Sequence, residues 1–163
     1  MNSISDAQSD MREAYFGGAP GIITSGTAWL VASLVAFFVS PRAGILTLIF
    51  GGMLIFPASV LLGKVIGCPG KHSKDNPLAP LAIEGTIWML LSIPVAAGAA
   101  FFRPGWFFPG MLLIIAGRYL TFSTLYGMRI YWTFGGVLVA ASAMLLLLRA
   151  PAFLSALTGA LIE

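Results

Sequence analysis

The chain has 163 residues, of which 58% are hydrophobic and 9% are charged, and its formal net charge at pH 7 is +3. A soluble domain carries about a quarter charged residues and could not bury so much apolar surface, so this composition excludes a soluble globular protein and predicts an integral membrane protein. The nine Lys and Arg residues are scattered among loops with no basic stripe, which excludes a nucleic-acid partner and leaves the lipid bilayer as the predicted environment.

Residues 1–19 are polar and mixed in charge, and they lack the basic stretch and cleavage site of a signal peptide. We predict a cytoplasmic N-terminal segment here, in which residues 3–16 form a short surface helix, with a frayed tail as the alternative. Ser5 and Gln8 fit a capping box at the start of this helix. One helical face carries the side chains of Ala7, Met11, Ala14 and Tyr15.

Five apolar runs follow, each long enough to cross a bilayer as a helix of about 20 residues. They cover residues 20–40, 43–66, 78–102, 106–128 and 131–148. Asn76-Pro77 fits the N-cap and the first helical position of the third run. The tail, 152–163, would be about 18 Å long as a helix, against a hydrocarbon core of roughly 30 Å. It is therefore predicted to be a partial sixth span, a re-entrant piece or an interfacial helix.

The predicted fold class is all-α. Residues 20–163 are expected to form one transmembrane helical bundle, with five full transmembrane helices and a short partial sixth.

A four-residue pattern occurs twice, as Gly26-Thr27-x-Trp29 and as Gly85-Thr86-x-Trp88. Each copy follows an Ala-Pro pair. After each copy come, in the same order, a turn that contains Pro and Arg, a Gly within the next span, and a Lys or Arg at the end of that span. We interpret this as a duplicated helical hairpin, at about residues 20–66 and 78–129, with a fainter third copy at 131–163. Hairpins repeat in the same orientation, so an axis along the membrane normal should relate the copies and place both Trp residues at one depth, as packing residues.

The loop charges predict the orientation in the membrane, because Lys and Arg are enriched on the cytoplasmic side. One set of loops holds five cations, Arg12, Lys64, Lys71, Lys74 and Arg129. The other set holds three, Arg42, Arg103 and Arg149. This bias places the N-terminus and the loop 67–77 in the cytoplasm.

Two charged residues fall inside predicted spans, Glu84 near the start of the third and Arg118 within the fourth. At 1.5 Å per residue their depths differ by roughly 6 Å, which the arginine side chain can cover. Either charge alone in lipid would cost about 3 kcal/mol on insertion scales. We therefore predict that Glu84 neutralises Arg118 within the bundle, either as a structural pair or as part of a functional site.

The fourth span is the most polar, which makes the surroundings of Arg118 a candidate binding site. The candidate substrate-binding residues are Glu84, Arg118, Tyr119, Thr121 and Thr124. Arg118, Thr121 and Thr124 follow helical spacing down one face and would line a polar cavity that opens to the cytoplasm. The alternative is that the Thr hydroxyls only bond their own helix or join helices.

The polar loop GCPGKHSKDNPL predicts no catalytic residue. It resembles a phosphate-binding loop, but Val65 stands where the first Gly is required, and His72 follows the Lys. His72, Ser73 and Asp75 are better explained as a solvated loop than as a hydrolase triad. The single cysteine, Cys68, and the single histidine also leave too few ligands for a disulfide or a metal, so no cofactor is predicted.

The stretches NPLAPLAIEGTIWMLL and FFPGMLLIIAGRYLTFSTLYGMRIYW, with the six-segment layout, resemble a small family of bacterial polytopic membrane proteins known only as a domain of unknown function. The resemblance covers roughly residues 20–163 and is most specific at Asn76-Pro77-Leu78 and Gly117–Arg129. It implies a bacterial inner membrane, a basic or His residue near Arg118, no hallmark role for Glu84, and a complete sixth span that this chain stops short of. The family carries no established activity, so nothing catalytic transfers.

Three functional hypotheses remain. The leading one is a non-enzymatic multi-pass membrane protein that binds or transports a small anionic solute at a polar intramembrane site around Arg118, because a strong cation near Ser and Thr favours anions. The second is a structural or assembly subunit in which Glu84 and Arg118 only fix helix packing. The third, a lipid-modifying enzyme, lacks a visible set of nucleophile, base and metal. Small residues such as Gly136 and Ala140 leave room for a homo-oligomer.

Overall fold

The computed structural model describes residues 3–163, and this part of the chain folds into helices joined by short turns and one longer loop. The helices are α1 (Ile4–Tyr15), α2 (Ala19–Phe38), α3 (Pro41–Val65), α4 (Ala79–Phe102), α5 (Phe107–Tyr126), α6 (Ile130–Leu147) and α7 (Ala152–Ile162). Two 3-10 turns, η1 (Phe16–Gly18) and η2 (Pro104–Trp106), precede α2 and α5. Five helices are long and apolar enough to cross a membrane and one apolar helix is shorter, which confirms the predicted fold class.

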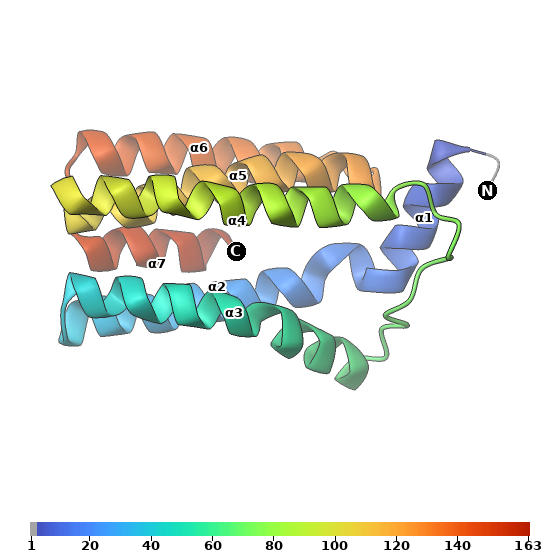
Figure 1. Cartoon of the computed structure of the whole chain (residues 1–163), viewed down its shortest axis with the longest axis horizontal. Helices are drawn as coiled ribbons and strands as arrows, with labels where there is room; N and C mark the ends of the chain where they lie inside the picture. Colours follow the sequence, from blue (N-terminus) through green and yellow to red (C-terminus); the bar gives the residue numbers. More distant parts are fainter. Residues whose placement is uncertain (1–2) are drawn as a thin grey trace.

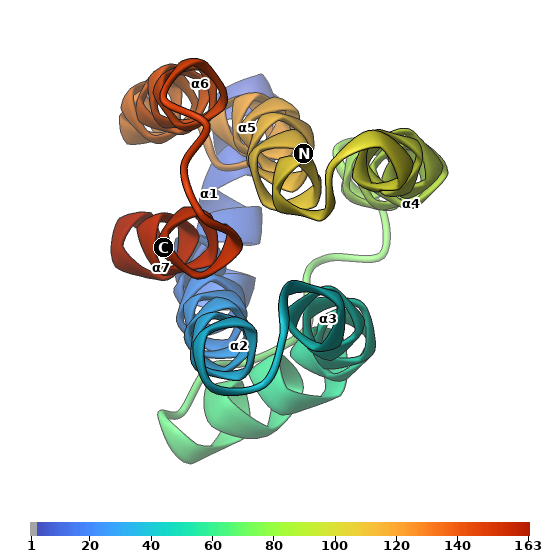
Figure 2. The same cartoon turned by 90° about the vertical axis from the view of Figure 1, so that its left-hand side faces the viewer.

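The bundle has two sides with a short helix between them (Figures 1 and 2). Antiparallel helices α2 and α3 form one side, and α4, α5 and α6 form the other. Helix α7 lies between the two sides and packs along α2, with Ala152, Ser155, Ala156 and Gly159 buried. It starts at the end of the bundle where α2, α4 and α6 finish, and it stops partway toward the other end (Figure 1). The tail is therefore the partial sixth span among the three alternatives.

Helix α1 covers the opposite end of the bundle (Figure 1). Its N-cap is Ser3, whose Oγ accepts a hydrogen bond from the N–H of Asp6 at 3.2 Å, so the predicted capping box of Ser5 and Gln8 is wrong. The Gln8 side chain instead reaches α5, where it donates to the carbonyl of Thr124 at 2.8 Å. The predicted apolar face is confirmed by the burial of Ala7, Met11 and Ala14.

The loop 67–77 is mostly exposed, as predicted, and hydrogen bonds anchor it to α1. The N–H of Gly70 donates to the carbonyl of Ala14 at 2.8 Å. The Asp10 carboxylate accepts from the Asn76 side chain at 2.7 Å and from the N–H of Ser73 at 3.0 Å. These hydrogen bonds, that of Asn76 first, hold the pKa of Asp10 below its ordinary value of 3.8.

Helix α4 begins two residues later than the predicted N-cap at Asn76 implies. Its first residue is Ala79, and Pro77 lies before it. The reason is the hydrogen bonding of Asn76: its Nδ2 is used by α1, and its Oδ1 accepts the N–H of Leu78 at 2.9 Å in a tight turn.

Helix α5 is the best-covered helix in the described range, with 11 of its 20 residues buried. It contacts α4, α6, α7 and α1. Ser142 of α6 adds a buried hydrogen bond to the carbonyl of Pro109 at 2.8 Å. Two polar side chains of α5, those of Tyr119 and Tyr126, are therefore held among protein groups rather than left in lipid.

Candidate functional site

Arg118 lies on α5, about 12 Å along the helix from Tyr126 at its C-terminal end. Its Nη1 donates to the hydroxyl of Thr86 on α4 at 3.0 Å and lies 3.9 Å from the sulfur of Met89. The guanidinium carbon is 5.1 Å from the centre of the Phe122 ring, at the distance of a cation–π contact. Arg118 thus occupies the α4–α5 interface at intramembrane depth.

The predicted pair of Glu84 and Arg118 is not formed. Glu84 is exposed, whereas Gly85, Thr86 and Met89 are among the α4 residues that contact α5. Each residue turns the helix by about 100°, so Glu84 points away from the face that Gly85 and Thr86 present. Similar depth in the membrane was therefore not sufficient for contact.

Glu84 instead lies near the start of α4, about 8 Å from its first residue. It lines a shallow hollow with Lys74, Asn76 and Pro80 beside the α1 end of the bundle. A carboxylate at that level reaches the headgroup layer, which explains why an apolar helix tolerates it.

Two of the three guanidinium nitrogens of Arg118 make no hydrogen bond to the protein. Only Nη1 donates to a protein group. Within residues 3–163, every buried side-chain nitrogen or oxygen has a hydrogen-bond partner. The Nε and Nη2 atoms of Arg118, which have none, are therefore not fully buried in the half-buried side chain.

The buried carboxylate of the site is Glu163, which the sequence analysis did not select. One of its oxygens accepts from the Tyr119 hydroxyl at 3.0 Å, and the other accepts from the hydroxyl of Ser25 on α2. Glu163 also acts electrostatically on Arg118. One signal in the sequence could have found it: Glu163 is the only acidic residue after Glu84. Its position at the end of a short tail, however, did not indicate that it would lie inside the bundle.

The remaining predicted residues divide between interior and surface. Tyr119 is buried and stacks on Tyr131 of α6, with ring centroids 5.6 Å apart and 14° between planes. The Thr121 hydroxyl bonds its own helix at the carbonyl of Gly117. Thr124 is exposed. The structure thus places Arg118 against α4 and Tyr119 against Glu163 and α6, and it leaves Thr124 and Glu84 exposed.

No cluster of three or more His, Cys, Asp or Glu side chains with metal-binding geometry is present among the described residues. The site consists instead of one cation, one carboxylate and hydroxyl groups, which can bind and orient a polar ligand by hydrogen bonding and charge.

The fold and this intramembrane polar cluster define a polytopic helical membrane protein. The chain belongs to the family of unknown function DUF7010, whose model matches residues 4–163, and this confirms the resemblance noted from the sequence. No curated protein and no solved structure matches the chain.

Proposed function

We propose that this protein is a non-enzymatic membrane protein that binds or transports a small anionic solute at Arg118. The observation that carries the proposal is the pair of guanidinium nitrogens, Nε and Nη2, that have no protein partner within a membrane-spanning helix. A guanidinium presents its donors as a planar fork, which suits a carboxylate or another oxyanion.

The electrostatics around Arg118 support an anion of low charge. The Glu163 carboxylate receives two hydroxyl donors, from Ser25 and Tyr119, and it accepts no hydrogen bond from Arg118. A cation left in lipid without a partner costs several kcal/mol. An anion that pairs with the open side of Arg118 would lower that cost, and its binding would therefore stabilise the folded protein.

A structural role remains the second candidate, and it rests on a different contact from the one predicted. The Ser25–Glu163–Tyr119 chain joins α2, α7 and α5, so it holds the two sides of the bundle together without any ligand. In this alternative Arg118 only balances the charge of Glu163.

The two candidates differ in their response to anions. Purified protein in a non-ionic detergent is unfolded thermally over a concentration series of sodium acetate, chloride or phosphate, with the ionic strength matched between the three salts. We expect a higher Tm with one of the test anions, equivalent to about 2.7 kcal/mol at a hundred times Kd. Arg118→Gln should lose this response.

Glu84→Gln is the matched control, because it removes an intramembrane-helix charge that does not contact Arg118. It should respond like the wild type. If Arg118→Gln does not fold, Arg118→Lys keeps the charge but not the planar fork, and it should bind the anion more weakly. An unchanged Tm of the wild-type protein in every anion would support the structural role and reject the proposed binding.

A further inference from the structure

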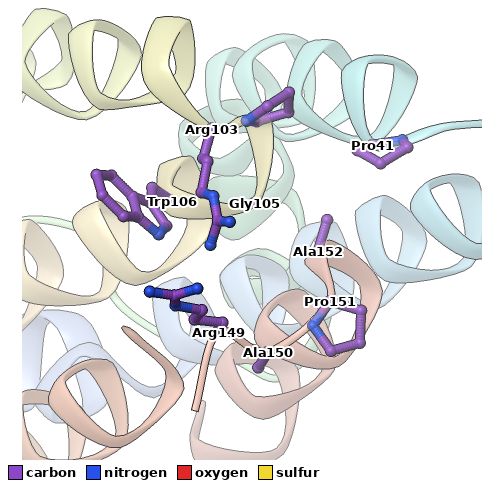
Figure 3. Close-up of a pocket in the computed structure, with 9 residues that line it drawn as sticks. Pro41, Arg103, Gly105, Trp106, Arg149, Ala150, Pro151 and Ala152 are labelled. Carbon is purple, nitrogen blue, oxygen red and sulfur yellow. The ribbon is translucent and has the colours of Figure 1, made fainter. Parts of the chain in front are cut away.

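Three interhelical turns meet at the end of the bundle opposite α1 and enclose a shallow pocket of about 470 Å³ (Figure 3). The α2–α3 turn contributes Pro41, the α4–α5 turn contributes residues 103–106, and the α6–α7 turn contributes residues 149–152. Segments more than a hundred residues apart in the chain therefore share one site. It is separate from Arg118, which lies deep in the bundle.

Two like charges face each other across this pocket. The guanidinium groups of Arg103 and Arg149 point toward one another, with the indole of Trp106 beside them (Figure 3). All six acidic residues lie elsewhere: five are in α1, the loop 67–77 or the first turns of α4, and Glu163 ends α7. Nothing nearby in the chain balances the two arginines, so their proximity favours an anion between them.

The overall charge distribution gives the same indication. The end of the bundle that carries α1 and the loop 67–77 has five basic and five acidic residues, which balance. The pocket end has Arg42, Arg103 and Arg149 and no acidic residue. The whole formal charge of +3 is therefore concentrated around this pocket.

The backbone at Arg149 is in a conformation that normally belongs to glycine. Its φ is 50°, in the left-handed region. Its N–H donates to the carbonyl of Leu146 at 3.1 Å and the next N–H donates to that of Leu145 at 2.9 Å, which is the Schellman ending of a helix. Glycine is favoured at that position, so an arginine there is kept against backbone strain and turns its charge into the pocket.

Backbone groups add to the positive potential. Helix α7 starts at Ala152 and α3 starts at Pro41, and both residues line the pocket. The first turn of a helix carries N–H groups with no partner within the helix, and the helix dipole is positive there. At α3, Pro41 has no N–H and the hydroxyl of Ser40 already accepts the N–H of Ala43 at 3.1 Å, so the open N–H groups are chiefly those that begin α7. That helix start beside two guanidinium groups forms a site suited to an oxyanion.

We propose that this pocket binds a phosphate group between the guanidiniums of Arg103 and Arg149. Trp106 is partly exposed, as expected for an indole at the level of lipid headgroups, so the pocket opens where lipid phosphates lie. The phosphate is supplied either by an anionic phospholipid or by free phosphate, which share this recognition chemistry.

The test measures the Tm of purified protein in non-ionic detergent with added phosphatidylglycerol, phosphatidylcholine or inorganic phosphate. We expect phosphatidylglycerol to raise the Tm of the wild type more than phosphatidylcholine. Arg103→Gln and Arg149→Gly should each weaken the apparent affinity about fivefold, the effect of one interfacial cation. Without lipid, Arg149→Gly should unfold no earlier than the wild type, because glycine relieves the strained backbone.

Two variants make the result specific to the pocket. Arg42→Gln removes a cation from the same end that does not line the pocket, and Lys71→Gln removes an exposed cation from the opposite end. Both should keep the full lipid response. A response to inorganic phosphate that equals the response to phosphatidylglycerol identifies free phosphate as the source. Equal lipid and phosphate responses in the wild type, Arg103→Gln and Arg149→Gly would overturn the proposal.

Discussion

The two Gly-Thr-x-Trp segments have the same local structure but different surroundings. Thr27 and Thr86 each donate to the carbonyl four residues earlier, at 2.8 Å in both cases. Their Trp residues differ: Trp29 is 1% exposed and Trp88 is 56% exposed. Thr86 also accepts a hydrogen bond from Arg118. The repeated sequence thus gives the same contacts within each helix, whereas the contacts between helices depend on which helices lie next to each segment.

The neighbours are α7 for the first segment and α5 for the second. A Cβ on Gly26 would lie 3.2 Å from the backbone of Glu163, whereas one on Gly85 would lie 3.1 Å from Thr121. Both glycines therefore allow a close helix contact, in keeping with the use of small residues in membrane bundles. Helix α2 packs against α3 and also against α7, which covers Trp29, whereas α4 packs mainly against α5. Trp29 is therefore enclosed and Trp88 is not.

The largest expected difference is between the two Trp residues. Trp29→Ala should lower the free energy of unfolding by about 3–5 kcal/mol, because it leaves a cavity among fully buried groups. Trp88→Ala removes a mostly exposed side chain and should change it by about 0.5 kcal/mol. Reversible unfolding of each variant in mixed micelles measures both values. Equal losses would mean that α7 does not enclose Trp29 in the membrane.

A second test removes the space that α7 provides for Trp29. A Cβ on Gly159 would lie 2.6 Å from the Trp29 ring, so Gly159→Val should cost about 1–3 kcal/mol by overpacking. Gly136→Val is the matched control, because nothing lies within 4 Å of a Cβ there. It should unfold like the wild type in the same assay, and a comparable loss in both variants would contradict the close packing of α7 on α2.

A smaller effect is expected at the two threonines. Thr86→Val deletes the acceptor for Arg118 while keeping the shape of the side chain, and it should cost about 1 kcal/mol. Thr27→Val loses only a bond within its own helix and should be nearly neutral. The comparison uses thermal unfolding midpoints, and a neutral Thr86→Val would show that Arg118 takes another partner.

The smallest expected effect concerns the parts of the chain that lead into the helices of the two segments. Helix α4 follows a loop held by Asp10, whereas α2 follows η1 directly. The pKa of Asp10 is lowered in the fold, so its contribution is present above the ordinary value of 3.8 and is lost as pH falls through the lower, folded pKa. Amide exchange at Ser73 should therefore accelerate below about pH 4, and Asp10→Asn should show faster exchange at neutral pH as well. Exchange that does not depend on pH, after correction for its intrinsic rate, would contradict this.

The span prediction succeeded because it rests on local properties. Apolar runs of about 20 residues must satisfy their backbone within the helix, and Pro and Arg mark their ends. The bounds of α3 to α6 accordingly fall within a few residues of the predicted ones. The duplication and the cytoplasmic N-terminus stay predictions.

The sequence by itself determined the membrane-helical class, the number of full spans and the presence of a strong cation in the fourth one, because hydropathy and charge are properties of each segment alone. The tertiary structure decided which side chains meet. Arg118 bonds Thr86 and not Glu84 because contact depends on rotation about the helix axis as well as on depth. Glu163 enters the site, and Arg103 meets Arg149, because α7 folds back between the two sides of the bundle. That packing is set by contacts between segments far apart in the chain, which no single stretch of sequence encodes.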